Sequence, residues 1–444
     1  MPIKVGFVSL GCAKNQIDTE YMLGAMKKNK KFEIVSDENS ADVIVINTCA
    51  FIQSAKEEAI DTILEFCKKK EKNLKSVVVT GCLAQRYKEE ILKNIPEVDA
   101  VIGINSQALL ETAIERSLEK EKVELFEDIE CLNQNKERVL TTPPHYAYLK
   151  IAEGCNNFCS YCAIPKIRGR YVSKSPEEIL KEAKWLEEKG IKELILIAQD
   201  TTYYGHDLKE EFKLEDLLKK LSTLNFKWIR FLYAYPERIT ESLIKTIKES
   251  KNILPYFDIP IQHINDDILK SMNRKTNKKQ ILEKIELIRK NIENATLRTS
   301  LIVGFPGETE KQFKELLNFV KEIKFDRLGC FSYSQEEGTK AALLENQIDE
   351  NTKEKRRKAI YKISEKILKQ KALADVEKTI EVIVDQEVDT YIDVTVYMSR
   401  TKRDAPKVDC VVFFSTEKKL KIGDIVNVYI KGIDRNSNLF GVLI

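Results

Sequence analysis

Six of the ten cysteines in this chain of 444 residues fall into two patterns that suit iron–sulfur chemistry. The tighter pattern is Cys155-Asn-Asn-Phe-Cys159-Ser-Tyr-Cys162, directly after an apolar run. Cysteine thiolates hold the irons of a [4Fe-4S] cluster, which usually takes four of them. Three closely spaced thiols therefore predict a cluster with one iron left open for chemistry. The alternatives are free thiols and a structural zinc loop, which needs a fourth Cys or His that is missing nearby.

A second set of three cysteines is dispersed along the first third of the chain. Each follows an apolar, β-branched run that predicts a buried parallel strand. The carboxyl ends of parallel strands line the crevice where ligands bind, so we expect Cys12, Cys49 and Cys82 to converge on a second, auxiliary cluster. The alternative is that they are small buried hydrophobic residues. Cys67 and Cys131 lack this context and are interpreted as ordinary thiols.

The composition is that of an ordinary soluble chain. Charged residues make up 32% and hydrophobic residues 43%, and the formal net charge is +3. This near-neutral balance gives no argument for a nucleic-acid partner. No apolar run approaches the roughly 18 residues that a membrane helix needs, and the N-terminus lacks a signal-peptide pattern. We therefore expect a cytoplasmic protein without a membrane partner, whose cysteines are metal ligands and thiols rather than disulfides.

The pattern of apolar runs predicts an α/β protein with three folded sections. Strands alternate with helices in the first section, which predicts a parallel α/β domain. Six further β/α units predict a partial barrel, open on one side, with its chemistry at the carboxyl ends of the strands. Short alternating strands then predict a small antiparallel, OB-like β-barrel. The expected ranges are 1–126 for the α/β domain, 127–144 for a linker, 145–348 for the partial barrel, 349–372 for a connecting helix and 373–444 for the β-barrel.

Several polar residues stand at or within the predicted barrel strands. Gln262-His263 and Gly304-Phe-Pro-Gly-Glu308 follow strand ends, but each of these signals is weak by itself. Arg298 lies inside the strand expected at 296–303, where a buried charge needs a partner. A cofactor carboxylate and a neighbouring acid would serve equally well, and both stay open at this point.

The cysteine triplet, with Tyr161 directly before Cys162, resembles that of the radical S-adenosylmethionine enzymes, in which the open iron binds the cofactor. The three sections together resemble the methylthiotransferases, which join a three-cysteine domain, a radical S-adenosylmethionine barrel and a TRAM barrel. Local motifs are similar to those of the branch that modifies a ribosomal protein (RimO). These motifs are Gly11-Cys-Ala-Lys-Asn15, Cys162-Ala-Ile-Pro-Lys-Ile-Arg-Gly169, Ala198-Gln-Asp-Thr-Thr-Tyr-Tyr-Gly205, Tyr256-Phe-Asp-Ile-Pro-Ile-Gln-His263 and Arg298-Thr-Ser-Leu-Ile-Val-Gly304.

That resemblance implies a transferase that adds a methylthio group to the β-carbon of an aspartate in the small-subunit ribosomal protein near the decoding centre. The cofactors that it implies are two [4Fe-4S] clusters and S-adenosylmethionine, two molecules per turnover. Its implied partners are a reductant, a sulfur donor and the ribosomal protein, free or on the ribosome, and we expect a monomer. The nearest alternative is the same chemistry on tRNA adenosine (MiaB). A non-catalytic iron–sulfur electron carrier and a zinc-containing RNA-binding protein are more distant alternatives.

The resemblance assigns roles only to residues that match the family's motifs. The cluster that cleaves S-adenosylmethionine falls to the cysteine loop, and the auxiliary cluster that handles sulfur falls to the dispersed cysteines. Tyr161 and Ile302 match positions that contact the adenine, and Arg298 is the candidate partner of the cofactor carboxylate. The expected metal ligands are Cys12, Cys49, Cys82, Cys155, Cys159 and Cys162.

The charge of the predicted C-terminal barrel bears on its partner. Residues 376–444 carry ten Lys or Arg against eleven Asp or Glu, a net charge of −1. A barrel that tracks a phosphate backbone is basic, so this balance favours a protein or a protein–RNA surface over RNA alone. The highly charged helix before the barrel is interpreted as a solvated connector. Four acids of the barrel are expected to face the basic ribosomal protein: Asp385, Glu387, Asp389 and Asp393.

Overall fold

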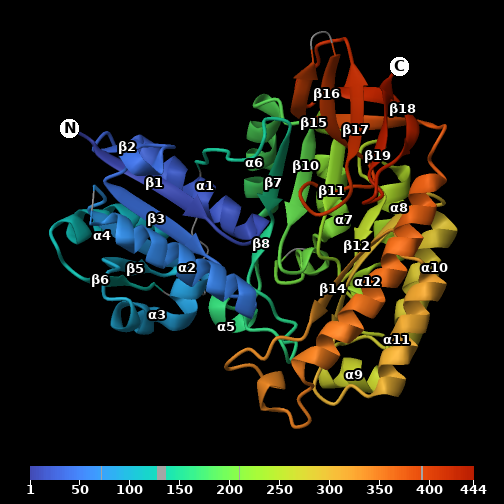
Figure 1. Ribbon diagram of the computed structural model, residues 1–444, viewed down its shortest axis with the longest axis horizontal. Helices are drawn as coiled ribbons and strands as arrows, with labels where there is room; N and C mark the ends of the chain where they lie inside the picture. The colour runs from blue at the N-terminus through green and yellow to red at the C-terminus, as the bar shows by residue number, and fades with distance from the viewer. Residues whose placement is uncertain (72, 128–136, 210, 392–393) are drawn as a thin grey trace. The chain divides into compact units, whose positions relative to one another are not determined.

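The computed structural model describes residues 1–71, 73–127, 137–209, 211–391 and 394–444 (Figure 1). The chain forms two compact units, each assembled from segments that are far apart in the sequence. Cys131, Asp393 and part of the expected linker lie outside the described residues, and the section boundaries drawn from the sequence stay predictions. Unit 1 comprises Met1–Thr141, Ala152–Lys174 and Ser334–Ala342, and unit 2 comprises Thr142–Ile151, Ser175–Tyr333 and Leu343–Ile444.

A six-stranded parallel sheet forms the centre of unit 1, in the order β2-β1-β3-β4-β5-β6 (blue to cyan in Figure 1). Strands that alternate with helices give the parallel α/β domain that the sequence predicted. The strands are β1 Ile3–Ser9, β2 Phe32–Ile34, β3 Val43–Thr48, β4 Ser76–Gly81, β5 Ala100–Ile102 and β6 Val123–Leu125. The helices are α1 Ala13–Lys28, α2 Gln53–Lys69, α3 Cys82–Asn94 and α4 Leu110–Leu118.

Two hydrophobic cores cover the two faces of this sheet. Ile44 of β3 packs with apolar residues of α2 and α3, whereas its neighbour Val45 packs with residues of α1 and α4. A strand that is buried on both faces is a continuous apolar run, which is why β3 lacks alternation. The first core also takes in Ala163 and Ile167, which lie at the short helix α5 (Ile164–Arg168). The segment after the cysteine loop therefore belongs to unit 1 by its packing.

Unit 2 contains the partial barrel of six parallel strands that the sequence predicted. Three strands pair in the order β7-β10-β11 and three in the order β12-β13-β14. The two halves meet where Ala234 donates a backbone hydrogen bond to Asp258 (2.8 Å). The strands are β7 Tyr146–Lys150, β10 Glu193–Ile197, β11 Trp228–Phe231, β12 Tyr256–Asp258, β13 Thr296–Val303 and β14 Arg327–Ser332. The helices are α6 Pro176–Glu188, α7 Leu214–Leu221, α8 Glu241–Glu249, α9 Asp266–Ser271, α10 Lys278–Asn291 and α11 Glu310–Ile323.

Local capping fixes where three of these helices begin. Ser175, Asn277 and Thr309 each accept a hydrogen bond from the backbone three residues ahead, and the side chain at that position bonds back to the cap. This reciprocal box satisfies backbone donors that a helix start leaves open.

The end of the chain closes into a small barrel in the order β15-β16-β17-β19-β18. Its neighbours pair antiparallel as predicted, except that β17 and β19 pair in parallel. The connecting helix α12 (Glu350–Leu373) precedes the barrel and runs beside α11 (Figure 1). The barrel strands are β15 Thr379–Tyr391, β16 Val394–Thr401, β17 Val412–Thr416, β18 Ile425–Ile433 and β19 Leu439–Leu443.

A chain of buried ion pairs joins the two barrels of unit 2. Glu193, at the start of β10, accepts hydrogen bonds from Arg230 (2.9 Å) and Arg400 (2.8 Å), and all three side chains are at most 2% exposed. Arg400 also binds Asp385 (2.7 Å), whose carboxylate lies 2.6 Å from the ring of His145. Because buried charges are costly unless they are paired, this network fixes one barrel against the other.

The expectation that Asp385 faces an incoming protein is wrong. Burial raises the pKa of its carboxyl, but His145 and Arg400 lower it by more, so Asp385 stays a charged partner of these two groups. Glu387 and Asp389 are exposed, as expected.

In the described part of the chain, no helix combines the length and the apolar character of a membrane span.

We predict that Glu193→Gln lowers the free energy of unfolding of unit 2 by roughly 3–5 kcal/mol, because two buried guanidinium groups lose their shared counter-charge. Urea unfolding followed by tryptophan fluorescence measures this loss, since both tryptophans, Trp185 and Trp228, lie in unit 2. The control is Glu381→Gln, which removes an exposed ion pair with Lys402 and should cost less than about 1 kcal/mol. Equal losses in the two variants would contradict the network.

The pH dependence of this loss has a definite sign. Burial raises the pKa of Glu193, but Arg400 and Arg230 lower it by more, so the folded pKa lies below the ordinary value. Its charge therefore stabilises the fold fully above the pKa of an unfolded glutamate, and this contribution disappears as the pH falls through the lowered folded pKa. The difference between wild type and Glu193→Gln should shrink over that acidic range.

Candidate functional site

Cys12, Cys49 and Cys82 lie at the carboxyl ends of three neighbouring strands of unit 1, β1, β3 and β4. Cys12 precedes α1, and Cys82 begins α3 directly after β4. Burial raises the pKa of the Cys82 thiol, and charge repulsion from the nearby Cys12 and Cys49 adds to this rise. The structure therefore brings together three thiols that are far apart in the sequence.

Two glycines allow this close approach. Gly11 has φ +87°, and a Cβ at this position would lie 2.9 Å from the Cys49 sulfur. Gly81 has φ +91°, and a Cβ there would lie 2.3 Å from the side chain of Asn47. Only glycine adopts this backbone conformation readily and leaves the space open.

Asn15, in the first turn of α1, connects the three strand ends. Its side-chain nitrogen donates to the backbone oxygens of Leu10 (3.0 Å) and Thr48 (2.9 Å), which lie just before the first two cysteines. Its side-chain oxygen accepts a hydrogen bond from the Cys82 thiol at 3.6 Å. One fully buried amide thus holds all three cysteine positions in register.

A buried guanidinium reaches the same place from the segment after the cysteine loop. Arg168, in α5, donates through Nη2 to Asn15 Oδ1 (2.7 Å) and the Cys82 sulfur (3.6 Å). The same guanidinium pairs with Asp18 and Glu153, each at 3.0 Å, and the Arg168 side chain is 1% exposed. This cation links the loop segment to the dispersed cysteines and adds positive charge beside their sulfurs.

The surrounding charges distinguish the three thiols. The protein atoms around the Cys12 sulfur raise its pKa by partial desolvation, but Lys14 and Arg168 lower it by more, so that its pKa lies below the ordinary value. Burial raises the pKa of Cys49, and it raises that of Cys82 to about 12. Cys12 also reaches the surface, whereas Cys49 and Cys82 are buried.

The cysteine loop itself lies in unit 1 rather than with the barrel strands. Cys155 donates from its backbone to Gly169 (3.2 Å), and its sulfur accepts a hydrogen bond from Asn157 (3.5 Å). Cys162 donates from its backbone to Cys159 (3.0 Å). Cys155 and Cys159 are buried and Cys162 is half-buried. Both three-cysteine sets therefore belong to one compact unit.

The segment 334–342 contributes a feature that the sequence did not reveal. Ala341 donates from its backbone to Ser160, inside the cysteine loop (2.8 Å). Glu336 of this segment is buried and pairs with Lys56 (2.9 Å) and Arg86 (2.7 Å). Because Arg86 lies one turn after Cys82 on α3, the segment anchors the loop to the helix that carries the third dispersed cysteine.

The donor chemistry of both sets fits iron–sulfur clusters. Thiolates are the preferred ligands of these clusters, and Lys14 and Arg168 favour the thiolate form of Cys12. Among the described residues, no three His, Cys, Asp or Glu side chains are already grouped as ligands of one metal ion. The fit therefore depends on the thiol chemistry and on the convergence of the strand ends.

Arg298 has protein partners in the structure. It pairs with Asp258 (2.9 Å) on the neighbouring strand β12 and lies 3.4 Å from Asp409 of the C-terminal barrel. Of the two alternatives that the sequence left open, this arrangement supplies the neighbouring acid. Ile302 is half-buried near the carboxyl end of β13, and Tyr161 is half-buried in the cysteine loop.

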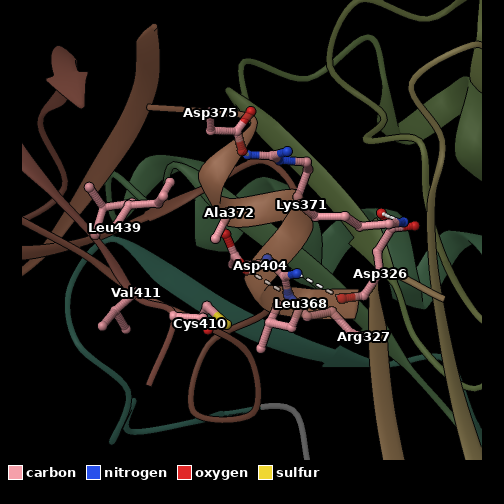
Figure 2. A pocket seen from close by; sticks show the side chains of 13 residues that line it. Asp326, Arg327, Leu368, Lys371, Ala372, Asp375, Asp404, Cys410, Val411 and Leu439 are labelled. Atoms are coloured by element: carbon pink, nitrogen blue, oxygen red, sulfur yellow. Dashed lines mark hydrogen bonds and ion pairs between the residues drawn. The ribbon is translucent and has the colours of Figure 1, made fainter. Parts of the chain in front are cut away.

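A pocket of unit 2 lies between β14, α12 and the C-terminal barrel (Figure 2). Charged side chains that line the pocket pair with one another: Arg327 pairs with Asp404, and Lys371 pairs with Asp326. Cys410 lines this pocket, and burial raises the pKa of its thiol. We therefore interpret this pocket as a crevice between packed elements rather than as a catalytic centre.

Three family models match the chain in succession. They are the uncharacterized protein family UPF0004 at residues 4–103, the radical SAM superfamily at 149–320 and the TRAM domain at 376–444. The second and third match the partial barrel and the closed C-terminal barrel described above.

Curated relatives are similar along nearly the whole chain. The "Ribosomal protein uS12 methylthiotransferase RimO" of Clostridioides difficile (strain 630) is 49% identical over 96% of this chain and 96% of its own. The proteins of that name from Clostridium novyi (strain NT) and Thermoanaerobacter sp. (strain X514) are 48% and 49% identical, over 96% and 95% of this chain and 95% and 96% of their own.

Solved structures share the fold at low identity. The radical S-adenosylmethionine methyltransferase TsrM from Kitasatospora setae has a TM-score of 0.55 and 12% identity, over 75% of each chain. The cobalamin-dependent S-adenosylmethionine radical enzyme OxsB has a TM-score of 0.51 and 14% identity, over 81% of this chain and 56% of its own.

In the iron-free protein, we predict that Cys12 reacts with iodoacetamide faster than Cys49 and Cys82 at neutral pH, because only its pKa is lowered. Mass spectrometry of the tryptic peptides over a time course measures the order. Lys14→Gln should slow the reaction of Cys12 at neutral pH and leave Cys82 unchanged. A faster reaction at Cys82 than at Cys12 would contradict the charge arrangement.

Proposed function

This chain belongs to the ribosomal protein uS12 methylthiotransferase family, RimO, and from that premise we propose that it adds a methylthio group to the β-carbon of an aspartate in protein uS12. It is a radical S-adenosylmethionine methylthiotransferase, an enzyme that uses S-adenosylmethionine and [4Fe-4S] clusters. The observation that carries the proposal is the presence of both three-cysteine sets in one unit, joined through Arg168.

The proposed ligands follow the two sets of thiols. The cysteine loop holds the cluster that acts on S-adenosylmethionine, and the dispersed cysteines hold the auxiliary cluster. When bound, the loop cluster and S-adenosylmethionine supply a carbon-centred radical, which removes a hydrogen that no side-chain base could take. The ligands are Cys155, Cys159 and Cys162 for the first cluster and Cys12, Cys49 and Cys82 for the second.

The remaining residues of the proposed site position and shield these ligands. Tyr161 and Ile302 are proposed to contact the adenine. Arg298 is left out, because its charge is shared with Asp258 and Asp409. Arg168 offsets the negative charge of a cluster on the dispersed thiols, since its guanidinium already touches Cys82. A reductant and a sulfur donor complete the reaction, and the protein is proposed to act as a monomer in the cytoplasm.

We predict about eight irons per chain after anaerobic reconstitution, and about four in either triple variant. Replacing Cys155, Cys159 and Cys162 by Ala should abolish the formation of 5′-deoxyadenosine. Iron analysis and chromatography of the cofactor products measure both quantities.

The complementary triple variant separates the two clusters. Replacing Cys12, Cys49 and Cys82 by Ala should retain cofactor cleavage and lose methylthiolation. Full iron content and full product in this variant would show that the dispersed cysteines hold no cluster. Replacing the buried Cys67, which has a pKa of about 11 because of its burial, is the matched control and should change neither quantity.

The substrate is tested in cells that lack this chain. We expect the methylthio group to be absent from uS12 and present as usual on tRNA adenosine, and re-expression of the chain should restore it on uS12. Mass spectrometry of the ribosomal protein and of tRNA nucleosides measures both. Loss from tRNA with an unchanged uS12 would replace the proposed substrate by tRNA, and loss from neither would favour an electron carrier.

A further inference from the structure

Helix α12 concentrates positive charge in a chain that is almost neutral as a whole. Its 24 residues include seven lysines and two arginines against three glutamates, a net charge of +6, whereas the whole chain carries +3. The net charge of the C-terminal barrel is −1 over 376–444. The positive charge of the chain is therefore local, and it lies outside the barrel that was expected to make the contact with substrate.

The cations of α12 divide into two groups. Four of them are held by acids of the fold: Lys353 by Glu350, Arg356 by Glu308, Arg357 by Glu354 and Lys371 by Asp326. The other five are exposed lysines at successive intervals of three, four, four and three residues. We call these five the lysine stripe: Lys355, Lys358, Lys362, Lys366 and Lys369.

The spacing places the lysine stripe on one face of the helix. Positions three and four apart lie above one another on a helix, so the five side chains form a row roughly 21 Å long. The opposite face is buried, with Ile360 and Ile367 directed to the rest of unit 2. In the described part of the chain, Lys358 has one ion pair (Glu354, 3.4 Å), and the other four lysines of the stripe have none.

We propose that the lysine stripe binds the phosphate backbone of ribosomal RNA and so docks the enzyme on the small ribosomal subunit. This proposal rests on the proposed function, because uS12 is a component of that subunit. A row of like charges suits a polyanion that carries one charge per phosphate. Interfaces between proteins are instead poor in lysine and rich in aromatic residues, and no aromatic residue interrupts the exposed row. Lysine binds phosphate as a point charge, without sequence preference.

The direct test compares two variants with the same change in net charge. In the stripe variant, all five lysines of the stripe are replaced by Gln. In the control variant, five exposed lysines elsewhere in unit 2 are replaced by Gln: Lys227, Lys245, Lys248, Lys251 and Lys290. The stripe variant should bind salt-washed small ribosomal subunits and a short duplex RNA at least about tenfold more weakly than wild type. The control variant should bind both within about threefold of wild type.

Salt dependence gives a second, independent measurement. If all five lysines contact phosphates, the slope of log K against log salt should become shallower by roughly 4–5 in the stripe variant. For wild type, these five contacts alone should lower the affinity for RNA on the order of several hundredfold between 50 and 200 mM salt. An unchanged slope, or an equal change in the control variant, would overturn the proposal.

Activity separates this proposal from the proposed function. The stripe variant should form 5′-deoxyadenosine and modify isolated uS12 like wild type, and should lose activity only on assembled subunits. Loss of subunit binding with unchanged binding to duplex RNA would mean a protein partner and would overturn the RNA assignment. If wild type modified no uS12 at all, the proposed function would fail while the RNA-binding result still stood. The partial variant Lys358→Gln/Lys362→Gln/Lys366→Gln should give an intermediate slope, which a folding defect would not produce.

Discussion

The ion pairs of the buried Arg168 guanidinium are the interactions on which the arrangement of unit 1 depends. The guanidinium is almost completely shielded from water, so its charge needs partners, and it finds them in Asp18 of α1 and in Glu153. A buried ion pair contributes little net stability but is very costly to break on one side. Moving the cysteine loop away from α1 would separate Arg168 from Asp18 and leave an unpaired buried charge, so this cost holds the loop against the parallel α/β sheet of unit 1. The contact with the Cys82 sulfur then follows from the same geometry.

Much of the fold could be predicted because its signals are local, whereas the grouping of the segments could not. Apolar, β-branched runs marked the strands, and the carboxyl ends of these strands predicted that the dispersed cysteines converge. The decisive contacts instead join distant residues: Arg168 meets Asp18 across 150 positions, and Glu336 meets Lys56 across 280. No local pattern encodes such a pair. Asp385 illustrates the same limit, because in the sequence it resembles the exposed acids that follow it, and only the fold shows that it is half-buried and paired with His145 and Arg400.

The ion pairs of unit 2 change how the C-terminal barrel should be understood. Its acids and arginines near the partial barrel are used for attachment, with Arg400 held by Glu193 and Arg327 held by Asp404. A barrel fixed in this way is part of the scaffold, and the residues that fix it are unavailable to a substrate. Recognition by the barrel is therefore left to its remaining exposed surface, where Glu387 and Asp389 lie.

The distribution of charge then decides what each surface of unit 2 can recognise. A nearly neutral chain argues against RNA binding only if its charges are evenly spread, and here they are not. The acids of α12 and its neighbours neutralise the cations on the packed face, for example Glu308 with Arg356 and Asp326 with Lys371. On α12, the positive charge that is left over lies in one exposed row, the lysine stripe. A basic ribosomal protein and its acidic RNA can thus be met by different surfaces of the same unit, which reconciles a neutral barrel with a ribosomal substrate.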